Sequence, residues 1–254
     1  HQLFYPIEKQ LKQDKIVTDI IREVILEREK LQQIMYYLFD HLTVTRFEGV
    51  ENVPKDGGVI IATNHMSRMD IPLLFVNPAR KDITALVAEK YVSYPGISWF
   101  AKTAGAIYID RSRADFGAFR EAQKLIKEGI AMGIAPEGTR SKIGELLEGK
   151  AGAILLAIRT GAPIVPVGLA GTEDSFKRLL TFRKPHMVAR FGKPYVIKEL
   201  PRENREEAMQ KAIDEIMCRI AALIPPRYWG FYKDHPRLQE LIAEQGGPVS
   251  NERS

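Results

Sequence analysis

A histidine and an aspartate stand five residues apart in the stretch NHMSRMD, residues 64–70. An imidazole with one ring nitrogen held by a carboxylate can take a proton from a hydroxyl with its other nitrogen. The stretch follows the apolar run VIIAT, so His65 stands where a strand is expected to leave a sheet, the edge at which open α/β sheets bind ligands. With His65 on the loop and Asp70 in the first helical turn, the two side chains can meet as a base and its orienting carboxylate.

The same stretch has a structural interpretation. Ser67 and Asp70 have the S-x-x-D spacing of a capping box, in which side chains bind the free N–H groups of a helix start. Capping accounts for both residues but not for His65. Ser67 is also a rival nucleophile, but no G-x-S-x-G pattern surrounds it, which favours the cap. The stretch alone leaves the choice between a catalytic pair and a cap open.

Two further stretches at expected strand ends could bind an anion. APEGTRS, residues 135–141, offers glycine, hydroxyls and a guanidinium, which suit a phosphate, although this is also the composition of an ordinary turn. GAIYIDRSR, residues 105–113, places Arg111 just beyond a strand, with a surface ion pair as the alternative. GELLEGKA, residues 144–151, imitates a P-loop but has Ala151 where Ser or Thr should bind Mg²⁺, which argues against nucleotide hydrolysis.

The elements that would position these residues alternate between strands and helices. Short β-branched runs predict strands at residues 44–49, 57–64, 83–89, 105–110, 131–135, 163–171 and 186–192. Helices are predicted at residues 70–77, 96–103, 114–127, 149–160 and 203–223. Such alternation is typical of an α/β fold with a mixed, mostly parallel central sheet flanked by helices, and this is the expected fold class.

Three regions are expected along the chain. Residues 16–39 carry apolar side chains at helical spacing, so residues 1–43 are expected to form an N-terminal amphipathic helical appendage for membrane association. Packing of this helix against the body of the protein is the default interpretation of the same pattern. Residues 44–224 form the α/β domain, and residues 225–254 a C-terminal helix and flexible tail.

Composition narrows the function classes. The chain has 254 residues, a formal net charge of +5 and one cysteine, Cys218, which excludes an internal disulfide framework and favours a reducing compartment. The scattered histidines predict no metal site. A basic stretch without acids suits an anionic lipid surface, with a solvated face as the alternative. It comprises Lys177, Arg178, Arg183, Lys184, Arg190, Lys193 and Lys198.

The expected location is the cytoplasmic face of a membrane, with peripheral attachment. No apolar run approaches the roughly 18 residues that span a bilayer, and no secretory signal is visible. Because the sequence begins at His1 and not at a methionine, this expectation leaves room for an anchor ahead of it. Nucleic-acid binding would rest on charge alone, without a recognised motif, and is not expected.

Taken in order and spacing, NHMSRMD, GAIYIDR, PEGTRS and APIVPVGL resemble the four motif blocks of the glycerolipid acyltransferases, over about residues 44–200. The likeness is greatest to PlsC-type 1-acyl-glycerol-3-phosphate acyltransferases. The resemblance implies transfer of a fatty acyl group from acyl-CoA or acyl carrier protein to the free hydroxyl of lysophosphatidic acid, giving phosphatidic acid. It implies no cofactor, and a phospholipid surface as the site of action.

The resemblance also implies roles for particular residues. His65 would be the general base on the acceptor hydroxyl, and Asp70 would orient it. The residues implied for the acceptor and its phosphate are Lys90, Arg111, Glu137, Gly138, Thr139 and Arg140. Glu137, which cannot attract a phosphate, would orient Arg111 or Arg140 or bind a glycerol hydroxyl. Pro163 and Pro166 belong to the block linked to the acyl chain or to the shape of the site.

Two departures from the family pattern concern pocket shape. Ala135 stands where relatives usually have an aromatic residue, and Ala106 stands where many have glycine. Neither position carries a charged or acid–base group, so we expect altered acyl-chain preference and not an altered reaction. The motifs leave open another acceptor, such as glycerol-3-phosphate, another lysophospholipid or a lyso-ornithine lipid. They also leave open a non-catalytic, basic membrane-surface protein of the same fold.

Overall fold

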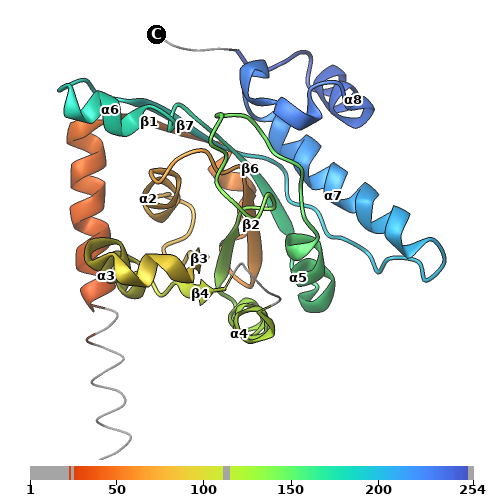
Figure 1. Cartoon of the computed structure of the whole chain (residues 1–254), viewed down its shortest axis with the longest axis horizontal. Helices are drawn as coiled ribbons and strands as arrows, with labels where there is room; N and C mark the ends of the chain where they lie inside the picture. The colour runs from red at the N-terminus through yellow and green to blue at the C-terminus, as the bar shows by residue number, and fades with distance from the viewer. Residues whose placement is uncertain (1–22, 24–25, 111–114, 251–254) are drawn as a thin grey trace, which may run out of the picture.

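A seven-stranded sheet in the order β1-β7-β6-β2-β5-β3-β4 forms the centre of the computed structural model, which describes residue 23 and residues 26–110 and 115–250. The strands are β1 (Val44–Glu48), β2 (Val59–Thr63), β3 (Thr84–Ala88), β4 (Ile107–Ile109), β5 (Ala131–Ile134), β6 (Ile164–Ala170) and β7 (His186–Phe191). Strands β6, β2, β5, β3 and β4 are mutually parallel, whereas β7 is antiparallel to β6 and parallel to β1. The predicted mixed, mostly parallel sheet is therefore confirmed (Figure 1).

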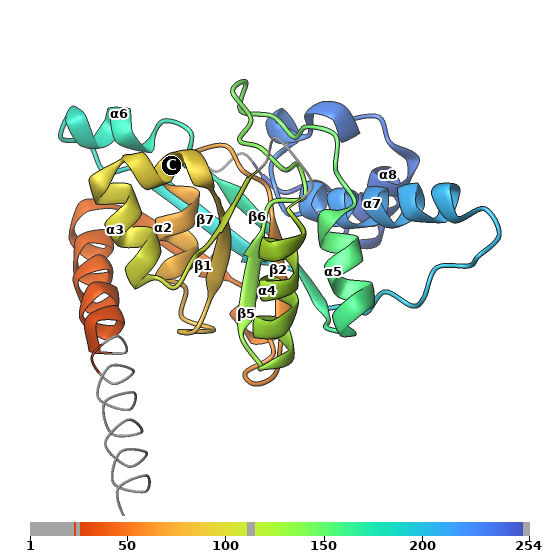
Figure 2. The ribbon, with the colours of Figure 1, turned by 60° about the horizontal axis from the view of Figure 1, so that its bottom comes forward.

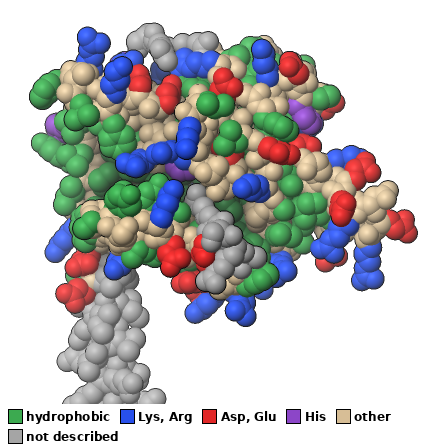
Figure 3. Space-filling model, viewed as in Figure 1, with side chains coloured by type: hydrophobic (Ala, Val, Ile, Leu, Met, Phe, Trp, Pro, Cys, Tyr) green, Lys and Arg blue, Asp and Glu red, His purple; other side chains and the backbone are tan. Residues whose placement is uncertain are grey.

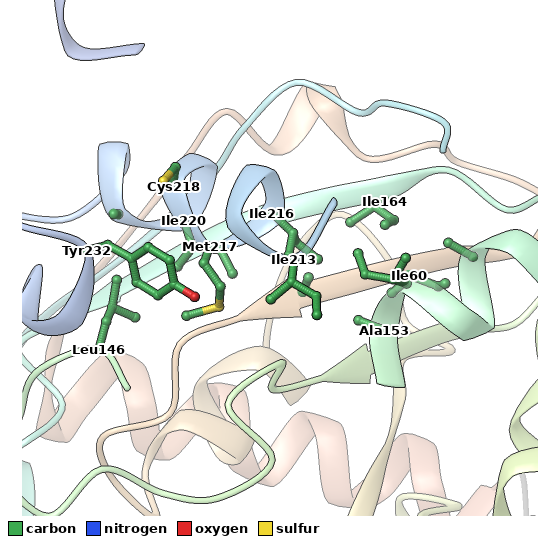
Figure 4. Packing of buried hydrophobic residues seen from close by; sticks show 14 of the residues in the cluster. Ile60, Leu146, Ala153, Ile164, Ile213, Ile216, Met217, Cys218, Ile220 and Tyr232 are labelled. Carbon is green, nitrogen blue, oxygen red and sulfur yellow. The ribbon is translucent and has the colours of Figure 1, made fainter. Parts of the chain in front are cut away.

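Helices bury both faces of this sheet. Within β2, Ile60 and Ala62 pack into one hydrophobic cluster, while Val59 and Ile61 pack into the other. The first face is covered by α4 (Phe116–Lys127), α5 (Gly152–Thr160) and α7 (Arg205–Ala222), with α8 (Pro236–Glu244) packed against α7. Figure 4 shows side chains of α7 lying over β2 and β6 in this core. The second face is covered by α2 (Asp70–Phe75) and by the N-terminal helix.

The N-terminal helix is described over residues 26–42, and the predicted residues 16–22, 24 and 25 lie outside the described part of the chain. Its buried Leu31 and Phe39 pack against the body of the protein, and Arg28 donates a hydrogen bond of 2.7 Å to the carbonyl of Ile83. The helix therefore packs on the domain, while side chains such as Ile34 and Tyr37 stay exposed. No helix among the described residues is both long and apolar enough to cross a bilayer.

Two further helices lie on the same side of the molecule as the N-terminal helix (Figures 1 and 2). Helix α3 (Pro95–Thr103) coincides with a predicted helix and follows the 3-10 turn η2 (Glu89–Ser93). Helix α6 (Ser175–Leu180) lies in the basic stretch that the sequence analysis did not assign to a helix. In both views α6 lies near the end of the N-terminal helix that leads into β1.

Candidate active site

His65 and Asp70 meet at the carboxyl end of β2. The ring Nδ1 of His65 lies 2.8 Å from Asp70 Oδ2. His65 is on the loop after β2 and Asp70 is the first residue of α2, so the chain turns between them and brings the side chains together. Because a carboxylate accepts, Nδ1 carries the proton and Nε2 is left as the basic nitrogen. The imidazole is 16% exposed, whereas the Asp70 side chain is 2% exposed.

Asp70 also caps the turn that leads into α2, whereas the helix itself, with Met69 at its N-cap, has no side-chain cap bond. Its Oδ2 accepts the backbone N–H groups of Met66 and Ser67, each at 2.7 Å. Ser67 takes the other half of the cap, because its hydroxyl accepts the N–H of Met69 at 3.1 Å. Among the described residues, Asp70 Oδ1 is buried without a hydrogen-bond partner. One carboxylate oxygen thus holds both the loop backbone and the imidazole.

Glu137 binds the backbone of the loop that carries His65. Its Oε1 accepts the backbone N–H of His65 and its Oε2 that of Leu147, both at 2.9 Å. The carbonyl of His65 in turn accepts the N–H of Ser141 at 2.8 Å. Both oxygens of Glu137 therefore accept backbone N–H groups, and neither bonds Arg140 among the described residues. Arg111 lies outside those residues, so the implied roles toward Arg111 or a glycerol hydroxyl stay predictions. This buried carboxylate is a positioning residue that joins the loop after β2 to the long loop between β5 and α5.

Burial raises the pKa of Glu137 to about 7. The hydrogen bonds from the backbone N–H groups of Leu147 and His65 lower this pKa, and the nearby charge of Asp70 raises it further, but burial is the largest effect. Because the unfolded chain ionises near pH 4.5, the folded state binds the proton more tightly between about pH 4.5 and 7. The free energy of unfolding should therefore fall by about 3 kcal/mol as the pH rises from about 4.5 to above 7.

The variant Glu137→Gln should lack this dependence on pH. We expect urea unfolding of the wild type at several pH values from 4.5 to 8 to show a decline that the variant does not share. The measured quantity is the difference in unfolding free energy between the two proteins, which cancels other titrating groups. Parallel curves for the two proteins would show that Glu137 stays ionised across the whole range.

Gly138 shapes the loop after Glu137. Its φ of 68° lies in the left-handed region that favours glycine, and its N–H closes a turn onto the carbonyl of Ala135 at 3.0 Å. The turn directs Glu137 into the interior and leaves Thr139 and Arg140 at the surface of a cavity. Gly138 itself does not line the cavities that contain His65.

The larger of these cavities, about 370 Å³, is apolar. It lies between α2, α3 and the sheet, with Phe176 of α6 at its wall. Phe75, Phe100 and Ala104 contribute to its lining, and Arg68 is its charged member. Ala106, one of the two departures from the family pattern, also lines it. The space has the size and chemistry of a pocket for an apolar ligand.

The smaller cavity, about 130 Å³, has a cationic wall. His65 and Asp70 line it together with Lys90, Arg140 and Lys142. Thr139 and Ala135, the second departure, are also part of its lining. Three cations around a hydroxyl and an imidazole suit an anion such as a phosphate. Sequence reasoning missed Lys142, although its place two residues after Arg140 on the same loop was the available signal.

The remaining candidates among the described residues do not line these cavities. Pro163 and Pro166 belong to the buried β6 region, where Pro163 accepts the N–H of Ile60 and Pro166 that of Gly192. Neither lines a cavity with His65, so an acyl-chain role for them stays a prediction. Arg111 lies outside the described residues. The P-loop-like stretch is a loop between β5 and α5, whose Gly149 N–H binds Tyr232 Oη at 3.0 Å.

Comparison with known proteins agrees with this geometry. The acyltransferase family model matches residues 44–170. The chain is 30% identical over 178 residues to the 1-acyl-sn-glycerol-3-phosphate acyltransferase of Borreliella burgdorferi, covering 69% of this chain and 71% of that protein. It is 32% identical over 168 residues to the Bacillus subtilis protein of the same name, covering 65% of this chain and 82% of that protein.

A solved structure is also similar. The crystal structure of the 1-acyl-sn-glycerophosphate acyltransferase PlsC from Thermotoga maritima matches with a TM-score of 0.58 and 28% identity, covering 74% of this chain and 79% of that one. The family match spans β1 to β6 and therefore includes the His65–Asp70 loop and the lining of both cavities except Phe176. The chain thus belongs to the acyltransferase family, as an enzyme of the PlsC-type glycerolipid acyltransferases.

Proposed function

We propose that the protein transfers a fatty acyl group from an acyl thioester, acyl-CoA or acyl carrier protein, to the free hydroxyl of lysophosphatidic acid. The observation that carries this proposal is the position of His65 in the lining of both an apolar and a cationic cavity. An acyl chain would occupy the first and the acceptor phosphate the second. The reacting hydroxyl and thioester would then meet beside the imidazole.

The reaction follows from the hydrogen-bond pattern at His65. Nε2 takes the proton of the acceptor hydroxyl as its oxygen attacks the thioester carbonyl carbon. Asp70 stabilises the imidazolium that forms, through the 2.8 Å contact with Nδ1. The tetrahedral intermediate collapses with cleavage of the C–S bond, and the imidazolium returns its proton to the leaving thiolate. This direct transfer needs no covalent acyl-enzyme, in keeping with the cap role of Ser67.

The acceptor phosphate is the part of the proposal that Arg140 tests. We expect Arg140→Ala to raise KM for lysophosphatidic acid by about 10- to 100-fold, since hydrogen bonds to charged groups contribute about 1.5–3 kcal/mol. Turnover of monoacylglycerol, which has the same hydroxyl without the phosphate, should change little. Arg120→Ala, on the exposed face of α4, is the matched control and should leave both substrates unaffected.

A panel of acceptors with lipid mass spectrometry tests the substrate itself. Lysophosphatidic acid should be acylated in preference to glycerol-3-phosphate, other lysophospholipids and lyso-ornithine lipids. Preference for one of these alternatives would keep the acyl transfer and replace the acceptor. Failure of every acceptor with both thioester donors would leave a membrane-surface protein that does not catalyse the reaction.

Peripheral attachment to the cytoplasmic face of a membrane is part of the same proposal. Its support is the exposed apolar face of the N-terminal helix, which includes Leu26, Ile34, Tyr37, Leu38 and Leu42. The basic stretch also supports it, but not with all of its cations. Arg178 is paired with Asp174 at 2.9 Å and Arg190 with Glu48 at 2.6 Å, so these two charges are already partly neutralised. Release from membranes by high salt or high pH is the expected behaviour, and release by detergent alone would contradict it.

A further inference from the structure

Helix α6 and the turn after it expose large apolar side chains that a helix would normally bury. Phe176, Leu180 and Phe182 are 49%, 82% and 100% exposed. Phe176 and Leu180 stand four residues apart and so share one face of the helix, and Phe182 follows two residues later. Residues 175–184 are called the α6 elbow below. Scattered exposed apolar residues are ordinary, but a contiguous group marks a contact surface.

The backbone conformation of Phe182 also disfavours a phenylalanine, so the stability of the fold does not account for this residue. Phe182 has a φ of 55°, in the left-handed region. Its N–H binds the carbonyl of Leu179 at 3.1 Å, and the N–H of Arg183 binds that of Arg178 at 2.8 Å. This is the Schellman motif that ends a helix, and Phe182 occupies the position where glycine is preferred. The isolated chain gains neither packing nor favourable backbone geometry from a phenylalanine at this position.

The charge around the elbow is positive. Lys177, Arg183 and Lys184 are exposed, and no ion pair joins them to an acid among the described residues. The nearest acid in sequence, Asp174, is paired with Arg178 at 2.9 Å. Exposed aromatic and aliphatic side chains interspersed with cations are complementary to an anionic lipid surface, which accepts apolar groups and attracts basic ones.

The elbow is continuous with the cavity that holds His65. Phe176 is at once half exposed and part of the apolar cavity wall, which it shares with Tyr91 and Ile97 of the η2–α3 segment. That segment also exposes Tyr94 and Trp99, by 52% and 59%. Figures 1 and 2 place α6 and α3 on one side of the molecule, and Figure 3 shows hydrophobic side chains gathered there with basic ones among them.

We infer that the α6 elbow inserts into the surface of an anionic phospholipid bilayer and presents the apolar cavity to it, so that lipid chains pass between membrane and site past Phe176. This inference adds a membrane contact to the proposed function. It depends on that function only for which lipid moves between the membrane and the site. It assigns membrane contact to a segment that begins 133 residues after the end of the N-terminal helix, which the elbow adjoins in space. A bilayer contact also gives the exposed phenylalanine at this glycine-favouring position a partner.

Sedimentation with vesicles of phosphatidylcholine and phosphatidylglycerol tests the inference. The double variant Leu180→Asn/Phe182→Gly should lower vesicle affinity by about tenfold or more, because two apolar side chains no longer insert. Its melting temperature should not fall, since glycine suits the backbone at residue 182. The matched control is Phe116→Asn, which removes a 72% exposed phenylalanine from α4 on the other face of the sheet.

A charge variant completes the test. Replacing Lys177, Arg183 and Lys184 by glutamine should weaken binding to the anionic vesicles by about fivefold for each cation and leave binding to pure phosphatidylcholine unchanged. The same substitutions at Arg120, Lys124 and Lys127 of α4 should have little effect. Wild-type affinity in either elbow variant, or an equal loss in the α4 controls, would overturn the inference.

The activity of the same variants separates this surface from the proposed reaction. With short-chain donor and acceptor in monomeric solution, both elbow variants should turn over like the wild type, because none of the replaced residues lines a cavity with His65. On substrates embedded in vesicles their rate should fall with their binding. A wild type inactive on every substrate would contradict the proposed reaction. The vesicle-binding measurements would still show whether the α6 elbow contacts the membrane.

Discussion

Replacing His65 by alanine should lower kcat for acyl transfer by about 10²- to 10⁴-fold, the range for loss of a positioned general base. The fold should survive, because the loop is held by backbone groups of residue 65. Its N–H binds Glu137 at 2.9 Å and its carbonyl accepts from Ser141 at 2.8 Å, and neither contact needs the imidazole. Thiol release from acyl-CoA in the presence of lysophosphatidic acid measures the effect, with thermal unfolding as the check on folding.

Ser67→Ala is the matched control for that experiment. Among the described residues, the one hydrogen bond of the Ser67 hydroxyl is the N–H that it accepts from Met69, so its loss should cost about 1 kcal/mol of stability and change activity by no more than a few fold. An inactive Ser67→Ala together with an acylated wild-type protein would replace the general-base mechanism by a covalent one. Full activity of His65→Ala would remove the histidine from the chemistry altogether.

The inner strands of the sheet, β2, β5 and β6, were predictable because they are buried on both faces. Such strands appear as short runs of β-branched residues, and each predicted run lies at a strand of the structure. Helix α6 was missed for the opposite reason. It has six residues, Phe176 and Leu180 are exposed, and Leu179 alone packs on the core, so no helical period of buried apolar positions can be recognised. A pattern that reports burial cannot find an element that is held at the surface.

The site was predictable where it depends on local spacing and not where it depends on packing. His65 and Asp70 are five residues apart, so one turn of chain decides whether they meet. Glu137 lies 72 residues from His65, and its contacts with backbone N–H groups leave no trace in the sequence. The apolar cavity likewise combines Phe75, Ala104 and Phe176 from separate elements, which no motif brings together.

Replacing Asp70 by asparagine should lower kcat by about 100-fold with little change in KM. The amide oxygen can take the place of Oδ2 and still accept from the imidazole and from the N–H groups of Met66 and Ser67. What the variant loses is the negative charge that stabilises the imidazolium, and hydrogen bonds to charged groups contribute about 1.5–3 kcal/mol. The effect therefore falls on the transition state and not on substrate binding.

The same substitution separates the catalytic role of Asp70 from its capping role. With the oxygen at the Oδ2 position, the amide NH₂ occupies the position of Oδ1, which is buried without a partner among the described residues. That unpaired donor should lower the free energy of unfolding by about 1–3 kcal/mol, measured by urea titration. Because Ser67→Ala weakens the same cap without touching the imidazole, it should lower stability alone. If both variants lost stability and neither lost kcat, Asp70 would be a cap and His65 would act without an orienting carboxylate.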